Sequence, residues 1–427
     1  MYAQNHDHDH DHDHDHQHAG SSHDDHSGHD HSDHAEEFHA PDGHDDSGHA
    51  NACGLVHDKG EFDPGELAFH HVSDQNVYNI GPLQIPLPCF MWVPKEGFDI
   101  FSSGKFNADS HGNGTKAYKK YVLHEGLVQR IPDFPTDELV DIGHHAVVGV
   151  KEMVNDKERT VSYLCYDGKK YKCDDRSTLD FGLFGGGITS FHDLSITKNV
   201  LSMGIVVFLL SLLFLKLAKA YRNREGMAPN GMQGLIEPVF VFIQDEVAKP
   251  FLGAKWQKFL PFLLAIFFFI LGLNLWGQVP FLGGSNVTGS LSVTFVLAII
   301  AFFVINLNGN KDYWKHVFWM PGVPAWVKTI LTPVEILGVF IKPMTLMLRL
   351  FANITAGHMV LVVFVSLIFV FSKNGLSFIG GYGTVIPSAL LSVFMMAIEL
   401  LVAFIQAFVF TILTASYIGA ATEEHHH

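Results

Sequence analysis

The hydrophobic and polar positions divide the chain into two unlike parts near residue 195. Polar stretches alternate with short apolar segments before this point, and long apolar runs dominate after it. Between Lys258 and Lys311 there is no Asp, Glu, Lys or Arg, whereas one membrane crossing needs only about 20 apolar residues. This stretch therefore predicts two spanning helices, near 259–282 and 290–308, hinged near Gly283 to Ser285.

Other apolar runs predict a first span from about Asn199 to Leu217 and two long segments, 333–372 and 385–418. A polar, amphipathic connection is expected over 228–258. As helices the long segments would reach about 60 and 50 Å, well beyond the roughly 30 Å of a bilayer core. Each must tilt or fold back, and Pro343 offers a break near the start of the first. With one crossing apiece, residues 196–427 form an α-helical polytopic membrane domain with about five crossings and two long tilted C-terminal helices.

Residues 55–195 predict a soluble, β-rich domain outside the membrane. Short alternating segments, such as Tyr118–Val122, Ala146–Val150 and Val161–Tyr166, are separated by Gly, Pro, Asp and Asn, a pattern typical of strands and turns. This domain contains no nucleophile constellation, phosphate-binding loop or HExxH-type metal motif, so its function is not legible from the sequence.

All four cysteines precede the first span, and two of them flank a hairpin-like segment around Asp167-Gly168. In an oxidising compartment this arrangement favours a Cys165–Cys173 disulfide. Four free thiols, at Cys53, Cys89, Cys165 and Cys173, are the alternative.

Residues 1–54 form a tract rich in His and Asp that cannot bury a core and is expected to be disordered. Its alternating imidazole and carboxylate groups would bind a divalent transition metal weakly. The candidate ligands are His6, His8, His10, His12 and His14. A solvated tail without any ligand is the alternative.

The distribution of charged residues predicts how the chain is oriented in the membrane. The net charge of −16 comes largely from the acidic first half, and no basic patch with interleaved aromatic residues suggests a nucleic-acid partner. Basic residues collect in two loops, at Lys216, Lys219, Arg222 and Arg224, and at Lys311, Lys315 and Lys328. The positive-inside rule places both loops and the C-terminus in the cytoplasm and the N-terminal domain outside.

Export of the N-terminal domain requires a signal peptide. However, the chain begins Met1-Tyr2-Ala3 and has no hydrophobic segment there. We expect that a signal peptide has been removed. The terminal His425–His427 are set aside in the interpretation of the fold.

Arg349 is the most informative residue of the membrane domain. It stands in an apolar run, where an arginine at mid-membrane costs about 2.5–3.5 kcal/mol and therefore usually faces protein or water. A snorkelling anchor at a helix end is the alternative. Asn353 and Ala356 share its helix face, which is small and polar enough for another helix to approach closely.

Glu399 stands alone in the second long segment, with Gln406 one heptad later. A lone intramembrane carboxylate indicates an ion pathway. His358, on the other long segment, titrates near neutrality and lies about half a helical revolution from Arg349. Glu399 and His358 are thus expected to form a proton relay between the two helices.

The stretch from Pro343 to His358, PMTLMLRLFANITAGH, resembles the signature of subunit a of the F-type ATP synthase. QAFVFTILT, from Gln406 to Thr414, is similar to that family's C-terminal signature. Asn274–Pro280, Leu291–Thr294 and Thr332–Glu335 match its middle segments, so the resemblance covers about 197–420.

The resemblance implies a proton-translocating stator subunit that forms two half-channels against a rotating ring of c subunits and has no catalytic turnover or cofactor of its own. Arg349 corresponds to the essential arginine facing the ring, with Asn353 and Gln406 beside it. Glu335 corresponds to an acidic residue of the cytoplasmic half-channel. His358 and Glu399 stand where many bacterial members carry the opposite residue of the pair. Gly277 stands where many members carry an Asp of the outer channel wall, so this chain departs from the family pattern there.

The implied partners are the c-ring, the b-subunit stator, the other ATP synthase subunits and the lipid bilayer, and the implied location is the bacterial inner membrane. Proton coupling is favoured over sodium, because sodium prefers oxygen ligands and would gain nothing from His358. A metal-ion transporter is the alternative function, although His358, Glu399 and Glu335 are too few ligands for a closed intramembrane site. A structural anchor would leave Arg349 and Glu399 without a purpose.

Overall fold

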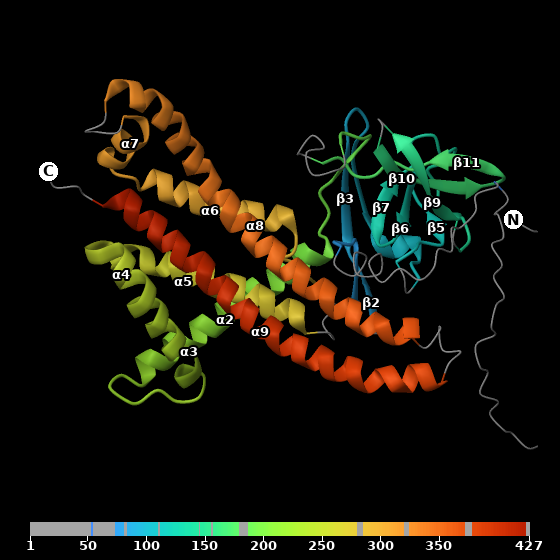
Figure 1. Ribbon diagram of the computed structural model, residues 1–427. Coiled ribbons are helices and arrows are strands. Elements are labelled where there is room, and N and C mark those ends of the chain that lie inside the picture. Colours follow the sequence, from blue (N-terminus) through green and yellow to red (C-terminus); the bar gives the residue numbers. More distant parts are fainter. Residues whose placement is uncertain are drawn as a thin grey trace, which may run out of the picture. The chain divides into compact units, whose positions relative to one another are not determined.

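The computed structural model describes residues 53, 73–80, 83–109, 112–144, 146–154, 157–178, 187–279, 285–319, 324–371 and 378–423. These residues form a β-rich part followed by a helical part (Figure 1), which confirms the predicted fold class. The His/Asp-rich tract and its five candidate metal ligands lie outside the described residues. The predicted domain boundaries near residues 54 and 195 stay predictions.

The β-rich part consists of small antiparallel sheets. The strands are β1 Val77–Ile80, β2 Leu83–Pro86, β3 Pro88–Val93, β4 Gly97–Ser102, β5 Lys116–Ala117, β6 Tyr121–His124, β7 Leu127–Arg130, β8 Val140–Asp141, β9 Val147–Val154, β10 Lys157–Tyr166, β11 Lys169–Lys172 and β12 His192–Asp193. They pair as β1-β2, β11-β10-β9, β12-β3-β4, β5-β8 and β6-β7. One apolar core lies around Met91, Phe101 and Tyr121, and a second around Ile131, Phe134 and Leu164.

Two of the three predicted strands are confirmed as parts of β9 and β10, and the third is interrupted. Tyr118 and Tyr121 exchange backbone hydrogen bonds of 2.9 Å, while Lys119 and Lys120 between them have φ of 50° and 65°. Two consecutive left-handed residues make the tight turn that suits a hairpin. The expected strand over Tyr118–Val122 is therefore a turn leading into β6.

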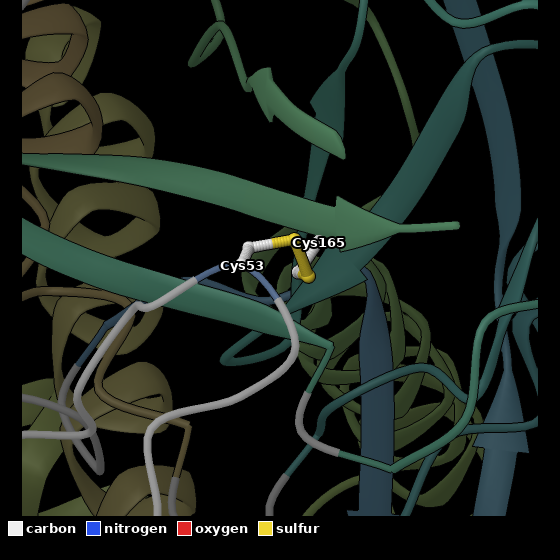
Figure 2. The surroundings of a disulfide bond; sticks show 2 residues. All are labelled: Cys53 and Cys165. Atoms are coloured by element: carbon white, nitrogen blue, oxygen red, sulfur yellow. A yellow bond between two sulfur atoms is a disulfide. The ribbon is translucent and has the colours of Figure 1, made fainter. Parts of the chain in front are cut away.

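The predicted hairpin around Asp167-Gly168 is confirmed, but the predicted Cys165–Cys173 disulfide is wrong. Cys165 is bonded to Cys53 instead (Figure 2), and Cys89 and Cys173 are buried free thiols. In the β10–β11 register Cys165 lies opposite Lys170, and Cys173 follows the last paired residue, Lys172. Because neighbouring strand residues point to opposite faces, Cys173 points with Leu164 into the core and Cys165 points away from it.

The helical part begins with α2 Lys198–Asn223 and continues through α3 Met232–Phe242, a π-helical segment η2 Ile243–Ala248, α4 Lys249–Leu252 and a 3-10 turn η3 Gly253–Lys255 into α5 Trp256–Gln278. The connection expected over 228–258 is thus helical from Met232 on. It is also partly buried, since Ile243 and Val247 join the main helical core.

The remaining helices are α6 Leu291–Leu307, α7 Lys311–Phe318, α8 Ala325–Phe371 and α9 Phe378–Thr422. Among the described residues, four helical stretches are long and apolar enough to cross a membrane, and a fifth span results if α6 and α7, bent by 106°, are taken together. The two long segments do not fold back. They remain single helices despite Pro343 in α8 and Pro387 in α9.

Helices α8 and α9 run side by side (Figure 1), with Leu346, Leu350 and Phe410 in the core that they share with α5. The last turn of α9 is fixed by donors from two other connections. Lys255 Nζ and Asn310 Nδ2 each donate to the Thr422 carbonyl at 2.8 Å, and Asn310 N donates to the Ala421 carbonyl at 2.8 Å. These bonds satisfy carbonyls that a helix end leaves unpaired, and so they fix the position of α9 along its axis.

Candidate functional site

Arg349 lies on an exposed face of α8. Ala352, Asn353 and Ala356 are exposed on the same side, while the neighbouring Leu346 and Leu350 are buried. No described residue forms an ion pair or hydrogen bond with the Arg349 guanidinium. The helix therefore presents an uncompensated cation among small residues, the surroundings in which another helix can approach closely.

A cavity of about 70 Å³, lined by both apolar and polar side chains, lies among α5, α8, α9 and the segment that precedes α6. It is lined by Leu273, Asn274, Gly277, Gln278, Asn286, Thr288, Asn353, Ile354, Gly357, Met395, Ile398, Glu399 and Val402. Of the predicted site residues, Asn353 and Glu399 are brought together here. A cavity with this volume and several polar groups can hold water.

The Glu399 carboxylate rests against the backbone of α8 at Gly357. A Cβ on residue 357 would lie 3.3 Å from Glu399 Oε1. Within the described part of the chain this buried oxygen accepts no hydrogen bond. A buried polar atom normally has a partner, so Oε1 is free to accept a bond from water in the cavity.

The backbone beside Glu399 is fixed by side-chain amides of α5. Gln278 Nε2 donates to the Glu399 carbonyl oxygen at 2.7 Å, and Asn274 Nδ2 donates to the Ala403 carbonyl oxygen at 3.2 Å. Asn274 Oδ1 in turn accepts a bond of 2.7 Å from the Thr288 hydroxyl. Together these bonds position the carboxylate at the cavity.

Asn286 supplies a second unpaired polar atom. Its Oδ1 accepts a 2.9 Å bond from Gly289 N, and its Nδ2 is buried without a partner among the described residues. Sequence analysis did not single out Asn286, Gln278 or Thr288. The available signal was a polar run, Asn286-Val287-Thr288, inside a stretch otherwise free of charge and mostly apolar.

The resemblance leads one to expect an Asp at position 277. Backbone atoms of Ser285 fill the space that a side chain on Gly277 would need. A Cβ there would lie 2.9 Å from the Ser285 carbonyl oxygen, a distance that no carboxylate side chain could accommodate without movement of the chain. The amides and hydroxyls of Gln278, Asn286 and Thr288 line the cavity in place of that acid.

The other predicted residues lie elsewhere or are only partly described. The backbone of His358 is in α8, directly after Gly357, and its side chain lies outside the described part. The His358–Glu399 relay therefore stays a prediction. Gln406 is buried in α9 with 6% of its surface exposed, about 10 Å along the helix from Glu399.

Glu335 belongs to a different region. Its Oε1 lies 3.9 Å from His316 Nδ1 of α7. Along α8 it is 22 residues from Gly357, or about 33 Å. Arg349 lies between Gly357 and Glu335 along α8, eight residues from the first and 14 from the second, or about 12 and 21 Å. Among the described residues no group of three or more His, Cys, Asp or Glu is placed to hold a metal.

Comparison with known proteins yields two family matches. The model of the ATP synthase A chain family matches residues 200–419, and a model of a domain of unknown function, DUF8433, matches residues 67–181. The first contains every candidate residue of the helical part, and the second covers most of the β-rich part.

Three similar bacterial proteins are all named as subunit a of ATP synthase. "ATP synthase subunit a 2" of Prosthecochloris aestuarii is 39% identical over 241 residues, which are 55% of this chain and 71% of that protein. "ATP synthase subunit a 2" of Chlorobaculum tepidum is 37% identical over 264 residues, 58% and 70% of the two chains. "ATP synthase subunit a" of Myxococcus xanthus is 36% identical over 243 residues, 55% and 75% of the two chains.

Proposed function

Because this chain belongs to the ATP synthase A chain family, we propose that it passes protons through two offset half-channels against a rotating ring of c subunits. The family makes it a multi-pass, proton-translocating subunit of the membrane sector that works with other ATP synthase subunits. The chain performs no catalytic turnover itself, and the ATP chemistry belongs to its partners. The exposed and unpaired guanidinium of Arg349 is the observation that carries the proposal.

An unpaired cation within a spanning helix needs a counter-charge or water. A carboxylate on the ring would supply it from the exposed face of Arg349, Ala352 and Ala356. The cation would in turn keep that carboxylate ionised and stop a proton from crossing directly between the half-channels. The guanidinium suits this role because it stays charged at every accessible pH.

The first half-channel runs through the cavity beside Glu399. Glu399 Oε1 and Asn286 Nδ2 are both buried without protein partners among the described residues, and water between them would satisfy both. A carboxylate facing water takes up and releases protons readily. His358, one residue beyond the Gly357 contact, is the second member of the relay.

The second half-channel lies at the level of Glu335. This carboxylate is partly exposed and faces His316, so the two groups could exchange a proton through water. Along α8, Glu335 and the Gly357 contact with Glu399 lie on opposite sides of Arg349, as offset half-channels require. Protons would reach the ring from one level and leave it at the other.

The basic loops after α2 and around α7 orient the molecule with its C-terminus in the cytoplasm and its β-rich domain in the periplasm of a bacterial inner membrane. The b-subunit stator is the expected partner on the cytoplasmic side. Proton coupling fits the His358–Glu399 pair better than sodium coupling does. The His-rich tract is expected to bind divalent metal weakly or to serve as a solvated tail.

A disulfide cross-link tests the orientation of the Arg349 face. In the assembled complex, Ala356→Cys should cross-link to a cysteine placed one turn from the ring carboxylate, because residue 356 is exposed beside Arg349. Val207→Cys on α2, which is 45% exposed, is the matched control and should not cross-link. Cross-linking at position 207 but not at 356 would contradict the proposed ring-facing surface.

A further inference from the structure

The sheet β12-β3-β4 has a buried core on one face and exposed apolar side chains on the other. Cys89, Met91, Val93 and Phe101 point inward to a buried core. Neighbouring strand residues point to opposite faces, so the residues between them form an outer face. It consists of Pro88, Phe90, Trp92, Phe98, Ile100, Ser102, His192, Leu194 and Ile196, and is called the outer face below.

The outer face is open in spite of its composition. Phe98 is 67% exposed, Ile100 65%, Leu194 59% and Trp92 41%. An antiparallel sheet that faces water on one side normally alternates apolar and polar residues, and a contiguous exposed apolar patch indicates an interaction site. The outer face holds no Asp, Glu, Lys or Arg, and His192 is its single titratable group.

The exposed rings are ordered rather than scattered. Trp92 stacks on His192 of β12 at 5.2 Å between ring centroids and on Phe98 of β4 at 6.3 Å. The stack crosses all three strands of the sheet. It presents a rigid, flat surface, and the indole and imidazole rings add polar edges to it.

The outer face runs directly into a membrane span. Leu194 N donates to the Phe90 carbonyl and Ile196 N to the Pro88 carbonyl, so the chain stays in the sheet until two residues before α2 begins at Lys198. The first turn of α2 is bound to the same domain, since Lys198 N donates to the Gln75 carbonyl at 2.8 Å and Asn199 N to Asp74 Oδ1 at 3.1 Å. No flexible linker separates the sheet from the helix.

The exposed apolar side chains continue along α2 itself. Leu194 and Ile196 lead to Val200, Val207 and Phe208, which are also exposed on a helix apolar enough to cross a membrane. Those side chains of α2 can only be covered by lipid or by another membrane helix. Along the chain, the outer face therefore leads directly to the exposed apolar side chains of a helix that can cross a membrane.

We propose that the outer face of the β12-β3-β4 sheet lies in the boundary between lipid headgroups and acyl chains, in the leaflet where α2 begins. Aromatic rings with polar edges concentrate at this boundary, and an uncharged apolar surface loses nothing by leaving water. A protein partner would cover the same rings, but the short, hydrogen-bonded passage into α2 favours lipid. The domain then serves as a second membrane anchor that holds the start of α2 at a fixed depth.

The test uses spin labels on the assembled ATP synthase in lipid nanodiscs. Phe98→Cys and Ile100→Cys are labelled with a nitroxide without reductant, which preserves the Cys53–Cys165 disulfide. Cys89 and Cys173 are buried, and burial raises the pKa of each thiol to about 12, so they do not react at neutral pH. Met153→Cys on β9, 71% exposed, is the matched control.

Relaxation of the nitroxide by oxygen, which partitions into lipid, is compared with its relaxation by chromium oxalate, which stays in water. Chromium oxalate is used in place of a nickel complex, because imidazoles of the His-rich tract would bind nickel. We expect oxygen to relax the nitroxides at residues 98 and 100 more strongly than chromium oxalate does, and the reverse at residue 153. Dominance of chromium oxalate at 98 and 100 would place the outer face in water. Low accessibility to both reagents at those positions would assign it to a protein partner, and either result overturns the proposal.

A photoactivatable diazirine lipid tests the unaltered complex in case the variants fail to assemble. Adducts should appear on the peptide that contains β3 and β4 and not on the one that contains β10 and β11. The absence of adducts on β3 and β4, with α2 labelled as an internal positive control, would also overturn the proposal.

Discussion

Gly357 in α8 makes room for the carboxylate of Glu399 in α9, because a Cβ on residue 357 would lie 3.3 Å from Glu399 Oε1. Glycine in a helix interior costs about 0.5–1 kcal/mol relative to alanine. The space gained lets the carboxylate approach the backbone of the neighbouring helix and reach the cavity. The glycine thus connects the packing of the two long helices with the proposed proton path.

Replacement of Gly357 by valine should slow proton pumping. Forcing an extra side chain into packed surroundings costs about 1–3 kcal/mol. If this cost adds to the barrier for proton transfer, the pumping rate falls by about five- to 150-fold. Gly338→Val on the same helix is the matched control, since a Cβ there meets nothing within 4 Å. ATP-driven acidification of inverted vesicles measures both. Equal rates in the two variants would show that the contact is not needed.

Arg349→Ala should reduce coupled pumping and ATP synthesis to background while the complex still assembles, since the described residues give Arg349 no structural partner. Arg349→Lys should fail as well, because lysine is a compact charge that loses its proton more readily when desolvated. Leu348→Ala, at a neighbouring exposed position, serves as the control. Normal pumping by the alanine variant would remove the central role assigned to Arg349.

The proposed relay predicts a specific rescue. His358→Ala and Glu399→Ala should each slow translocation severely, though less completely than loss of Arg349, because each removes one member of the proposed relay and leaves the other without its partner. The double exchange of His358→Glu with Glu399→His should recover more pumping than either single exchange. A double variant no faster than the slower single exchange would mean that the two residues do not act as a pair.

Asn286 allows its two amide atoms to be tested separately. Asn286→Asp keeps an acceptor for Gly289 N and removes the Nδ2 donor, so assembly should be preserved while proton transport falls. Asn286→Leu also removes the bond to Gly289, worth about 0.5–1.5 kcal/mol, and should lower the amount of assembled complex as well. Blue-native gels together with pumping rates per assembled complex distinguish the two effects. Unchanged transport in Asn286→Asp would exclude Nδ2 from the water path.

The buried thiols predict a pH dependence of the β-rich domain. Burial is the largest cause that raises the pKa of Cys89 and Cys173 from 9.0 to about 12. The unfolded chain therefore loses these protons first as pH rises, and stability that is full below about pH 9 should decline between pH 9 and 12. Thermal unfolding followed by alkylation should show this decline in the native chain and less of it in Cys89→Ala and Cys173→Ala. A flat stability over this range would contradict the assigned burial.

The sequence alone determined the membrane class and the two long C-terminal helices, and it singled out Arg349 and Glu399 as candidate site residues. These features depend on properties that are local along the chain: long apolar runs identify spans, and a charge inside such a run is costly wherever the helix packs. The hairpin around Asp167-Gly168 was predictable for the same reason, since a tight turn is specified by its own residues.

Only the tertiary structure decided which residues meet. Cys165 bonds Cys53 because the register of β10 and β11 turns Cys165 and Cys173 to opposite faces. The residues of the cavity come from three helices and a connection, and Gln278 and Glu399, which are 121 positions apart, are joined by helix packing that no local pattern encodes. Whether a polar residue lines a cavity or only contacts its own helix depends on this packing, and so Asn286, Gln278 and the closed position at Gly277 became apparent only in the folded chain.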